Sequence, residues 1–413
     1  MNRFDKVIEE LVLERFLRYV KIWTTSDRIL AREKTPSTER QFDLLNTLEK
    51  EMREIGISDI FYNEKGYLIG RIPGNTKAET IGFMAHVDTA SDAPGKDVKP
   101  QVHKNYDGSV IELNKSLMID PDEDTDLSLY LGKTVITTDG TTLLGADDKA
   151  GVAEIMTAAS IIMSSDEIKH GDIELIFTPD EETGCGMDNF PKEILHARAC
   201  YTMDGGREGE LEDECYYAYG ADLLFEGIVI HPGSARGKLV NAVTMASSYV
   251  SMLPRNESPE ATDGRYGNFW AQNISGTLER ASVHILLRSF DADDIQRRVK
   301  ALHSFAAAVE AAFPGGKVYV EVKKQYVNMK EKLDQNPRVM ANVEKAFERA
   351  AVEPHKVIIR GGTDGSRLTE MGIPTPNIFT GGHNFHSRKE WIAVPAMVKA
   401  TKVILNLVEI WTE

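Results

Sequence analysis

The stretch KAGVAEIMTAASIIMSSDEIKHGDIELIFTPDEETG, residues 149–184, holds a helix pattern followed by a strand pattern. A helix is expected over residues 149–163, and the short apolar run of residues 173–177 predicts a buried strand. Three acids, residues 180–182, follow at the end of that strand. Like charges packed at a strand end repel one another and are costly to remove from water. The three acids therefore either form a solvated loop or lie beside a positive group.

Helix and strand patterns also alternate on both sides of this stretch. Helices are expected at residues 5–22 and 37–56, the second with Ser37 as its N-cap. Strand patterns fall at residues 59–64, 67–72, 80–87, 134–138 and 199–204. Unbroken apolar strands that alternate with helices predict an α/β fold, with a mostly parallel sheet flanked by helices.

A different order of elements begins near Cys215. The patterns there predict strand, helix, strand, strand, helix and strand, which is the βαββαβ order of a ferredoxin-like α+β domain. After Asn328 the α/β pattern resumes. We therefore expect a domain of residues 215–328 inserted into a larger domain that residues 1–214 and 329–413 build together.

Charge and cysteine content limit the possible partners and compartment. The 413 residues carry a formal net charge of -16, which argues against nucleic acid and anionic membranes as partners. The three cysteines form no C-x-x-C pair, which is typical of a protein from a reducing cytosol. The charged, amphipathic N-terminal segment predicts neither a signal peptide nor a membrane span. A cytoplasmic protein is expected.

Two motifs at strand ends carry possible metal ligands. His86 and Asp88 lie two residues apart, so both side chains point to one face of the strand end. A carboxylate can hold the second nitrogen of a metal-bound imidazole, but the pair also fits a histidine beside a surface acid. Asp147 and Asp148 begin a predicted helix, where one aspartate can cap the helix and the other can bridge cations.

Further candidate ligands follow at successive strand ends of the same predicted sheet. They are the acids of residues 180–182, Asp204 before a Gly-Gly pair, and His383 and His386 after another Gly-Gly turn. Nitrogen and oxygen ligands without thiolates suit Zn²⁺, Co²⁺ or Mn²⁺. A carboxylate shared by two ions would make a two-metal hydrolytic centre.

The motifs, in this order, resemble those of the M20 metallopeptidases, in particular the peptidase T branch of tripeptide aminopeptidases. The resemblance extends over almost the whole chain. Its longest strings are GFMAHVDTA (residues 82–90), TTDGTTLLGADDKAGVAEIMTA (137–158), HGDIELIFTPDEETG (170–184), RGGTDGSRL (360–368) and NIFTGGHNFHSRKEW (377–391).

The resemblance implies roles for individual residues. Two Zn²⁺ ions per subunit are implied, with Co²⁺ or Mn²⁺ as possible substitutes. One ion would be held by His86, Asp147 and Asp204. The other would be held by Asp147, Glu182 and His386. Glu181 would be the general base, Asp88 would orient His86, and the peptide bond after Asp147 would be cis.

The resemblance also implies a substrate and a partner. The substrate would be a tripeptide, from which a metal-bound water removes the N-terminal residue with Glu181 as general base. Arg288 and Arg360 would bind the terminal carboxylate, and His231 would reach the active site of the partner subunit in a homodimer formed through the inserted domain. On composition alone His231 also fits a structural turn, and either arginine also fits a solvated surface.

One departure from the branch is found in its last motif. His383 and Phe385 stand where the branch typically has tyrosines. We assign the ligand to His386, which occupies the family position, and expect His383 to line the pocket. Two other functions remain open: another M20 hydrolase, such as a dipeptidase or an N-acyl amino acid deacylase, and a non-catalytic relative. A non-catalytic relative would have lost a metal ligand or the general base, and this chain keeps every residue that the resemblance assigns to those roles.

Overall fold

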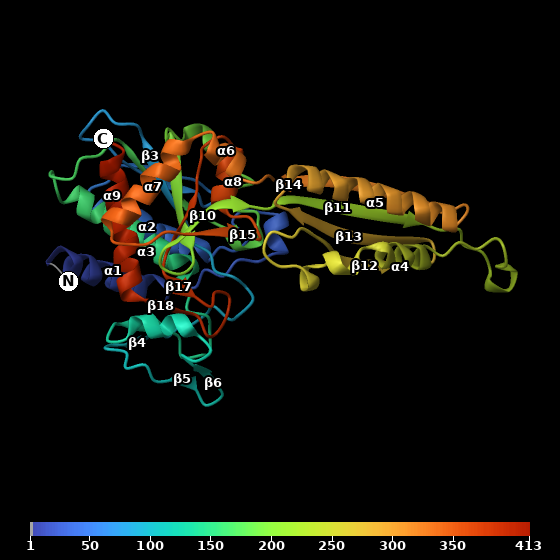
Figure 1. The fold of residues 1–413 in the computed structure, drawn as a ribbon, viewed down its shortest axis with the longest axis horizontal. Coiled ribbons are helices and arrows are strands. Elements are labelled where there is room, and N and C mark those ends of the chain that lie inside the picture. Colours follow the sequence, from blue (N-terminus) through green and yellow to red (C-terminus); the bar gives the residue numbers. More distant parts are fainter. Residues whose placement is uncertain (1–2) are drawn as a thin grey trace. The chain divides into compact units, whose positions relative to one another are not determined.

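The computed structural model describes residues 3–413, which divide into two compact units (Figure 1). Among the described residues, the first unit contains residues 3–213, 331–357 and 363–413. The second contains residues 214–330 together with the short segment 358–362, which the sequence assigned to the larger domain. The residues of the candidate metal centre all belong to the first unit.

A mixed sheet is the framework of the first unit. Within residues 3–413 it has eight strands, in the spatial order β1-β2-β8-β3-β9-β16-β10-β15. The middle strands β8, β3, β9 and β16 run parallel, and antiparallel pairs lie to either side of them. The bounds are β1 Asp59–Tyr62, β2 Leu68–Ile72, β3 Ile81–His86, β8 Ile173–Thr178, β9 Ala199–Gly205, β10 Glu210–Cys215, β15 His355–Ile359 and β16 Asn377–Phe379.

Helices cover both faces of this sheet, as the unbroken apolar strands predict. Helix α3 packs on β3 and β9, α2 packs on β2, and α8 lies against β9. Leu368 of α8 shares a buried cluster with Met84 of β3, whereas Met52 of α2 lies close to Gly70 of β2 on the other face. The bounds are α1 Arg3–Tyr19, α2 Gln41–Glu54, α3 Ala146–Met163, α6 Lys330–Asp334, α7 Pro337–Arg349, α8 Asp364–Glu370 and α9 Val394–Ile410.

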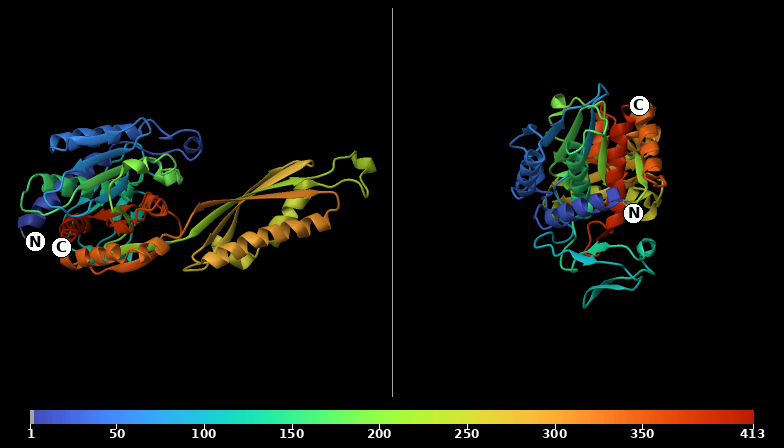
Figure 2. Two further views of the ribbon diagram at one scale, coloured as in Figure 1. Left: turned by 90° about the horizontal axis from the view of Figure 1, so that it is seen from above. Right: turned by 90° about the vertical axis from the view of Figure 1, so that its left-hand side faces the viewer.

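The two ends of the chain meet in this unit. The N-terminal helix α1 (blue) packs beside the C-terminal helix α9 (red), and both contact α3 (Figure 2). All residues of α3 from Asp148 to Ala159 are buried, because the helix is covered by the sheet on one side and by α1 and α9 on the other. This central position makes the N-terminal end of α3 a rigid support for Asp147.

A smaller antiparallel sheet, β17-β18-β7-β4, accompanies the main one. Its strands and the neighbouring hairpin are β4 Gln101–His103, β7 Val135–Thr137, β17 Gly382–His383, β18 Trp391–Ala393, β5 Ile111–Asn114 and β6 Leu117–Ile119. Strands β17 and β18 pair with each other, so the loop between them is held at both ends. That loop carries His386 and Glu390.

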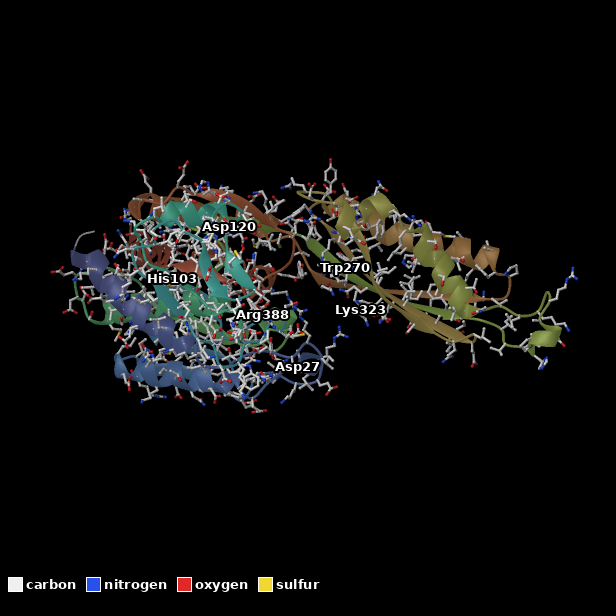
Figure 3. All side chains as sticks on the ribbon, turned by 90° about the horizontal axis from the view of Figure 1, so that it is seen from below. Asp27, His103, Asp120, Trp270, Lys323 and Arg388 are labelled. Atoms are coloured by element: carbon white, nitrogen blue, oxygen red, sulfur yellow. The ribbon has the colours of Figure 1, made fainter. Side chains whose placement is uncertain are left out.

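The second unit has the order of elements that the sequence pattern predicts. Strand β11 Tyr217–Glu226, helix α4 Ala242–Met252, strands β12 Asn268–Gly276 and β13 Arg280–Ser289, helix α5 Ala292–Ala312 and strand β14 Lys317–Tyr326 follow one another. The sheet order is β12-β13-β11-β14, and both helices pack on it. Trp270 on the edge strand β12 is exposed, and Lys323 lies on the opposite edge strand β14 (Figure 3).

The expected N-cap of α2 is wrong. Helix α2 begins at Gln41, with Arg40 as its N-cap residue and no capping side chain. Ser37 lies outside the helix, and its hydroxyl donates a hydrogen bond to the Asp180 carboxylate. Ser37 precedes the helix pattern as an N-cap would, but Asp180 accepts hydrogen bonds from the side chains of both Ser37 and Gln41 instead.

No helix within residues 3–413 combines the length and the apolar character needed to cross a membrane.

Candidate active site

The parallel register places the candidate ligands at one edge of the main sheet. His86 at the end of β3 lies opposite Thr178 at the end of β8, so the turn of residues 180–182 comes next to it. Met84 lies opposite Thr202 of β9, which places Asp204 near His86 as well. The carboxyl ends of parallel strands are where α/β proteins build their sites.

Asp147 is the centre of the cluster. Its Oδ1 lies 2.9 Å from Nε2 of His86, and its Oδ2 lies 3.0 Å from Nε2 of His386. Asp204 Oδ1 lies 3.5 Å from Nε2 of His86, and Glu182 Oε1 lies 3.0 Å from Nε2 of His386. Each oxygen of Asp147 therefore faces a different imidazole, that of His86 or that of His386.

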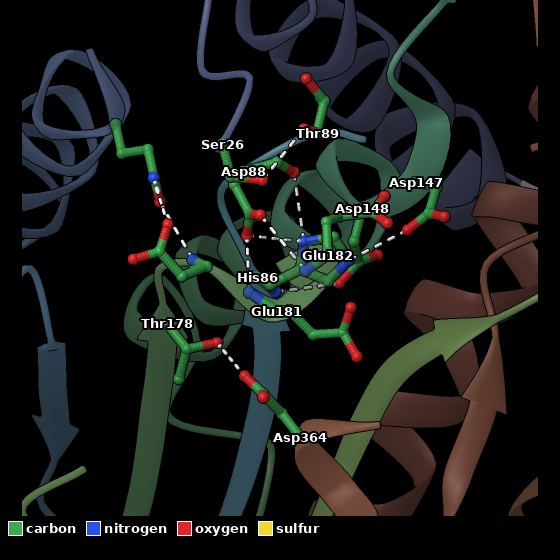
Figure 4. Close-up of polar contacts among 12 residues, drawn as sticks. Ser26, His86, Asp88, Thr89, Asp147, Asp148, Thr178, Glu181, Glu182 and Asp364 are labelled. Carbon is green, nitrogen blue, oxygen red and sulfur yellow. Dashed lines mark hydrogen bonds and ion pairs between the residues drawn. The ribbon is translucent and has the colours of Figure 1, made fainter. Parts of the chain in front are cut away.

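Asp88 joins the strand end to the acidic turn. Its carboxylate is fully buried and its Oδ1 lies 3.3 Å from Nδ1 of His86. The same carboxylate accepts hydrogen bonds from the backbone N–H groups of Glu181, at 3.0 Å, and Glu182, at 3.3 Å (Figure 4). The backbone carbonyl oxygen of Asp88 also lies 3.1 Å from Nδ1 of His86, so Asp88 holds both the His86 ring and the turn that carries the two glutamates.

The Glu181 carboxylate makes no hydrogen bond or ion pair within residues 3–413. Burial raises its pKa well above the usual value, and the neighbouring carboxylates Asp204, Asp364 and Glu182 raise it further. Asp364 itself is buried, accepts a hydrogen bond from the Thr178 hydroxyl at 2.6 Å, and has a pKa raised to about 7 by burial. The Glu181 side chain is therefore available to accept a hydrogen bond or a proton inside the cluster.

Asp148 faces the backbone. Its Oδ2 accepts a hydrogen bond from the N–H of His86 at 3.1 Å, and its Oδ1 accepts one from the N–H of Gly151 at 3.2 Å. The peptide bond between Asp147 and Asp148 is cis, and both residues have non-helical backbone angles inside α3. The two adjacent aspartates consequently direct their carboxylates to different partners.

The charges of the cluster fit bound cations. Burial raises the pKa of Asp204, and it raises the pKa of Glu182 to about 7. Hydrogen bonding to Asp147 and Glu182 raises the pKa of His386 to about 10. Buried carboxylates that face imidazoles in this way favour added positive charge. Ligand atoms of His86, Asp147 and Glu182 lie within 4.8 Å of one another, as do those of His86, Asp148 and Asp204.

His383 lies apart from the cluster. Its ring stacks on the Trp391 indole, with ring centres 3.8 Å apart, and its Nδ1 is 3.8 Å from Oδ2 of Asp126. Burial lowers its pKa to about 4, so the ring is neutral near pH 7. His386, on the same loop, contacts Asp147 and Glu182 instead.

The remaining predicted site residues belong to the second unit. His231 is exposed and its Nδ1 accepts a hydrogen bond from the N–H of Gly233 at 3.1 Å. Arg288 donates to the carbonyl of Leu287 at 2.9 Å, and Arg360 donates to the Thr262 hydroxyl at 3.1 Å.

The guanidinium carbon of Arg360 lies 5.7 Å from the centre of the Tyr216 ring, and that of Arg288 lies 5.7 Å from the centre of the Tyr326 ring. Burial raises the pKa of the Tyr216 hydroxyl, and the two guanidinium groups lower it, Arg360 more than Arg288.

Two residues of the site were not singled out from the sequence, and a third, Asp180, was noted there only as a member of the acidic run. Glu390 and Asp364 are buried acids near the cluster, and Asp180 anchors the acidic turn. Glu390 follows His386 by four residues in the last motif, so proximity to a ligand was the available signal. Asp180 adopts a left-handed φ of 59°, which a sequence pattern does not reveal.

Comparisons with known proteins agree with this arrangement. The profile of Peptidase family M20/M25/M40 matches residues 137–410. The peptidase T of Clostridium perfringens (strain SM101 / Type A) is 46% identical over 404 residues, which cover 97% of this chain and 99% of that protein.

Solved structures show the same fold. The aminopeptidase PepT of Bacillus cereus ATCC 10987 superposes with a TM-score of 0.76 at 22% identity, covering 98% of this chain and 99% of that one. The YXEP protein of Bacillus subtilis, a dinuclear metal-binding peptidase of the M20 family, superposes with a TM-score of 0.67 at 13% identity, covering 98% of each chain.

The α/β fold with candidate ligands at the strand ends and the profile match define a peptidase: the chain belongs to the M20/M25/M40 family. Its near full-length similarity to peptidases T places it in the peptidase T branch of that family.

Proposed function

We propose that the protein is a dinuclear metallo-aminopeptidase that removes the N-terminal residue from tripeptides. The observation that carries the proposal is the position of Asp147, whose two oxygens face His86 and His386 separately. A carboxylate placed in this way can be shared by two cations. The peptidase T relatives and the PepT neighbour support the substrate class.

We assign the ligands to two sets, as the family resemblance implies. One cation would be held by His86, Asp147 and Asp204. The other would be held by Asp147, Glu182 and His386. Asp148 is left out of both sets because its two oxygens accept hydrogen bonds from backbone N–H groups. Zn²⁺ suits imidazole and carboxylate ligands, and Co²⁺ and Mn²⁺ are chemically related substitutes.

Glu181 would act as the general base. When bound, the two cations would supply a water of lowered pKa and would polarise the scissile carbonyl. Glu181 would accept the proton of that water and then deliver it to the leaving amine, which requires a carboxylate outside the ligand sets. Burial raises the pKa of Glu181, which favours uptake of a proton by its carboxylate.

Asp88 would orient His86 for metal binding. A carboxylate at Nδ1 fixes the tautomer that leaves the Nε2 lone pair for the cation. The 3.3 Å separation between Asp88 Oδ1 and His86 Nδ1 supports this role.

The second unit would supply the substrate-binding groups. Arg288 and Arg360 would bind the terminal carboxylate of the peptide, since a guanidinium can hold a carboxylate with two hydrogen bonds. His231, exposed on its turn, would reach the active site of a partner subunit. The exposed edge strand β12 supports a homodimer formed through this unit. The acidic, cysteine-poor chain supports a cytoplasmic location.

A substrate panel tests the proposed function. Four substrates are compared with Zn²⁺ or Co²⁺ supplied: a tripeptide with free termini, the same tripeptide acetylated at its amino end, the matching dipeptide, and an N-acetyl amino acid. We expect rapid release of the first residue from the free tripeptide only. Preferred cleavage of the dipeptide would indicate a dipeptidase, and preferred cleavage of an N-acyl amino acid would indicate a deacylase.

A further inference from the structure

Glu390 is a buried acid that the mechanism above does not use. It is 1% exposed and lies directly before β18, four residues after His386. Its Oε2 accepts hydrogen bonds from the N–H groups of Leu144, at 2.7 Å, and Gly145, at 2.8 Å. Its Oε1 accepts one from the N–H of Asp147 at 3.1 Å. All three donors belong to the segment that presents the Asp147 carboxylate.

This segment needs an outside acceptor. The first N–H groups of a helix have no carbonyl partner within the helix. Here Gly145 has a left-handed φ of 81°, and Asp147 has a ψ of 104°, so the segment does not continue the helix geometry that would hold it. A buried carboxylate with three donors meets this need, because hydrogen bonds to an ionised acceptor are stronger than those to a neutral one.

A single loop therefore holds Asp147 in two ways. His386 contacts the Oδ2 of its side chain at 3.0 Å, and Glu390 accepts a hydrogen bond from its backbone N–H. The loop is itself fixed, because the ring of His383 at its start stacks on Trp391 at its end. The position of Asp147 relative to His386 is thus set through Glu390.

We propose that Glu390 is a positioning residue of the metal centre, which holds the backbone of Asp147 so that its two oxygens face two separate cation sites. The inference rests on the proposed dinuclear function and extends it to a residue that touches neither cation. This positioning role requires a carboxylate, whose two oxygens both accept hydrogen bonds. A glutamine offers one accepting oxygen and one donating NH₂ group, so at least one of the three N–H groups would face a donor.

Glu174 offers a matched control. It is also 1% exposed, and its carboxylate accepts hydrogen bonds from the N–H groups of His196 and Ala197 at 3.0–3.1 Å. It holds a loop that carries no candidate ligand. Glu174→Gln should therefore disturb the fold in a comparable way without altering the metal centre.

The test titrates the metal-free wild type, Glu390→Gln and Glu174→Gln with Co²⁺ and records the visible absorption spectrum and the two dissociation constants. Thermal unfolding of each metal-free protein is measured alongside. We expect Glu390→Gln to bind Co²⁺ roughly 10- to 100-fold more weakly with an altered spectrum, the usual cost of losing a group that orients a ligand. Glu174→Gln should keep the wild-type spectrum and affinities.

If Glu390→Gln keeps the wild-type spectrum and the wild-type affinities for Co²⁺, the inference is overturned. The proposed function still stands in that case, provided that the wild type binds two Co²⁺ ions. Equal changes in Glu390→Gln and Glu174→Gln would also overturn it, since they would show a general effect on folding. Failure of the wild type to bind Co²⁺ would instead contradict the proposed function itself. If Glu390→Gln does not fold, Glu390→Asp is measured; it keeps the charge but shortens the reach, and unchanged Co²⁺ binding would overturn the inference.

Discussion

At the scale of the residue, three adjacent acids have three different environments. Asp180 turns away from the cluster and accepts hydrogen bonds from Ser37 and Gln41. The Glu182 carboxylate faces His386, and the Glu181 carboxylate makes no hydrogen bond or ion pair within residues 3–413. The sequence could show that the run either lies beside a positive group or forms a solvated loop. It could not show which of the three carboxylates faces which partner, because that depends on the backbone angles of one short turn.

Replacing Glu181 separates metal binding from hydrolysis. Because Glu181 belongs to neither proposed ligand set, Glu181→Ala should keep its metal content and lower kcat by about 10²- to 10⁴-fold, the usual contribution of a general base. Metal analysis and tripeptide turnover are measured on the same preparation. Glu182→Ala is the matched control and should lose metal. Robust turnover by Glu181→Ala would rule out its role as the base.

The two histidines of the last motif give opposite expectations. His386 contacts two proposed ligands, whereas His383 stacks on Trp391. His386→Ala should therefore bind one equivalent of metal less than the wild type, and His383→Ala should bind as much as the wild type. Elemental analysis of both variants checks this. Full occupancy in His386→Ala together with a loss in His383→Ala would reverse the assignment.

At the scale of the element, strands and helices determine which candidate ligands lie close together. Turns and loops fix the positions of those side chains. The alternation of apolar strands and helices predicted which strand ends meet, and the pairing of β3 with β8 and β9 agrees with it. The contacts that hold the loops were not predictable. Ser37 fits a helix N-cap by its local sequence pattern. Only the fold shows that its hydroxyl instead donates a hydrogen bond to Asp180, 143 residues away.

Asp180 links the start of α2 to the acidic turn. Its oxygens accept hydrogen bonds from the N–H and hydroxyl of Ser37 and from the Gln41 amide, at 2.5–2.7 Å. Asp180→Asn replaces one accepting oxygen by a donor and should lower the free energy of unfolding by about 1–3 kcal/mol. We also expect a lower kcat, because the turn carries Glu181 and Glu182.

The control for this prediction is Ser37→Ala, which removes one hydroxyl and leaves the carboxylate its other two donors. Its effect on unfolding should be smaller than that of Asp180→Asn. Denaturant unfolding and tripeptide kinetics are measured for both variants. Wild-type stability and kcat in Asp180→Asn would show that the link does not hold the turn.

At the scale of the whole molecule, the chain forms two units with different chemistry. The candidate metal centre lies in the first, and the proposed carboxylate-binding arginines lie in the second, with Arg360 on the short segment 358–362. The insertion was foreseeable because the order of elements changes near Cys215. The grouping of residues 358–362 with the second unit was not, because their sequence continues the α/β pattern.

The central claim is that two cations share Asp147, and a stoichiometric titration tests it most directly. The metal-free protein is titrated with Zn²⁺ or Co²⁺, and tripeptide turnover is measured after each addition. We predict no turnover without metal and a maximum at about two equivalents per chain, as a two-metal site requires. Full turnover by the metal-free protein, or a maximum at one equivalent with no second binding event, would contradict the account.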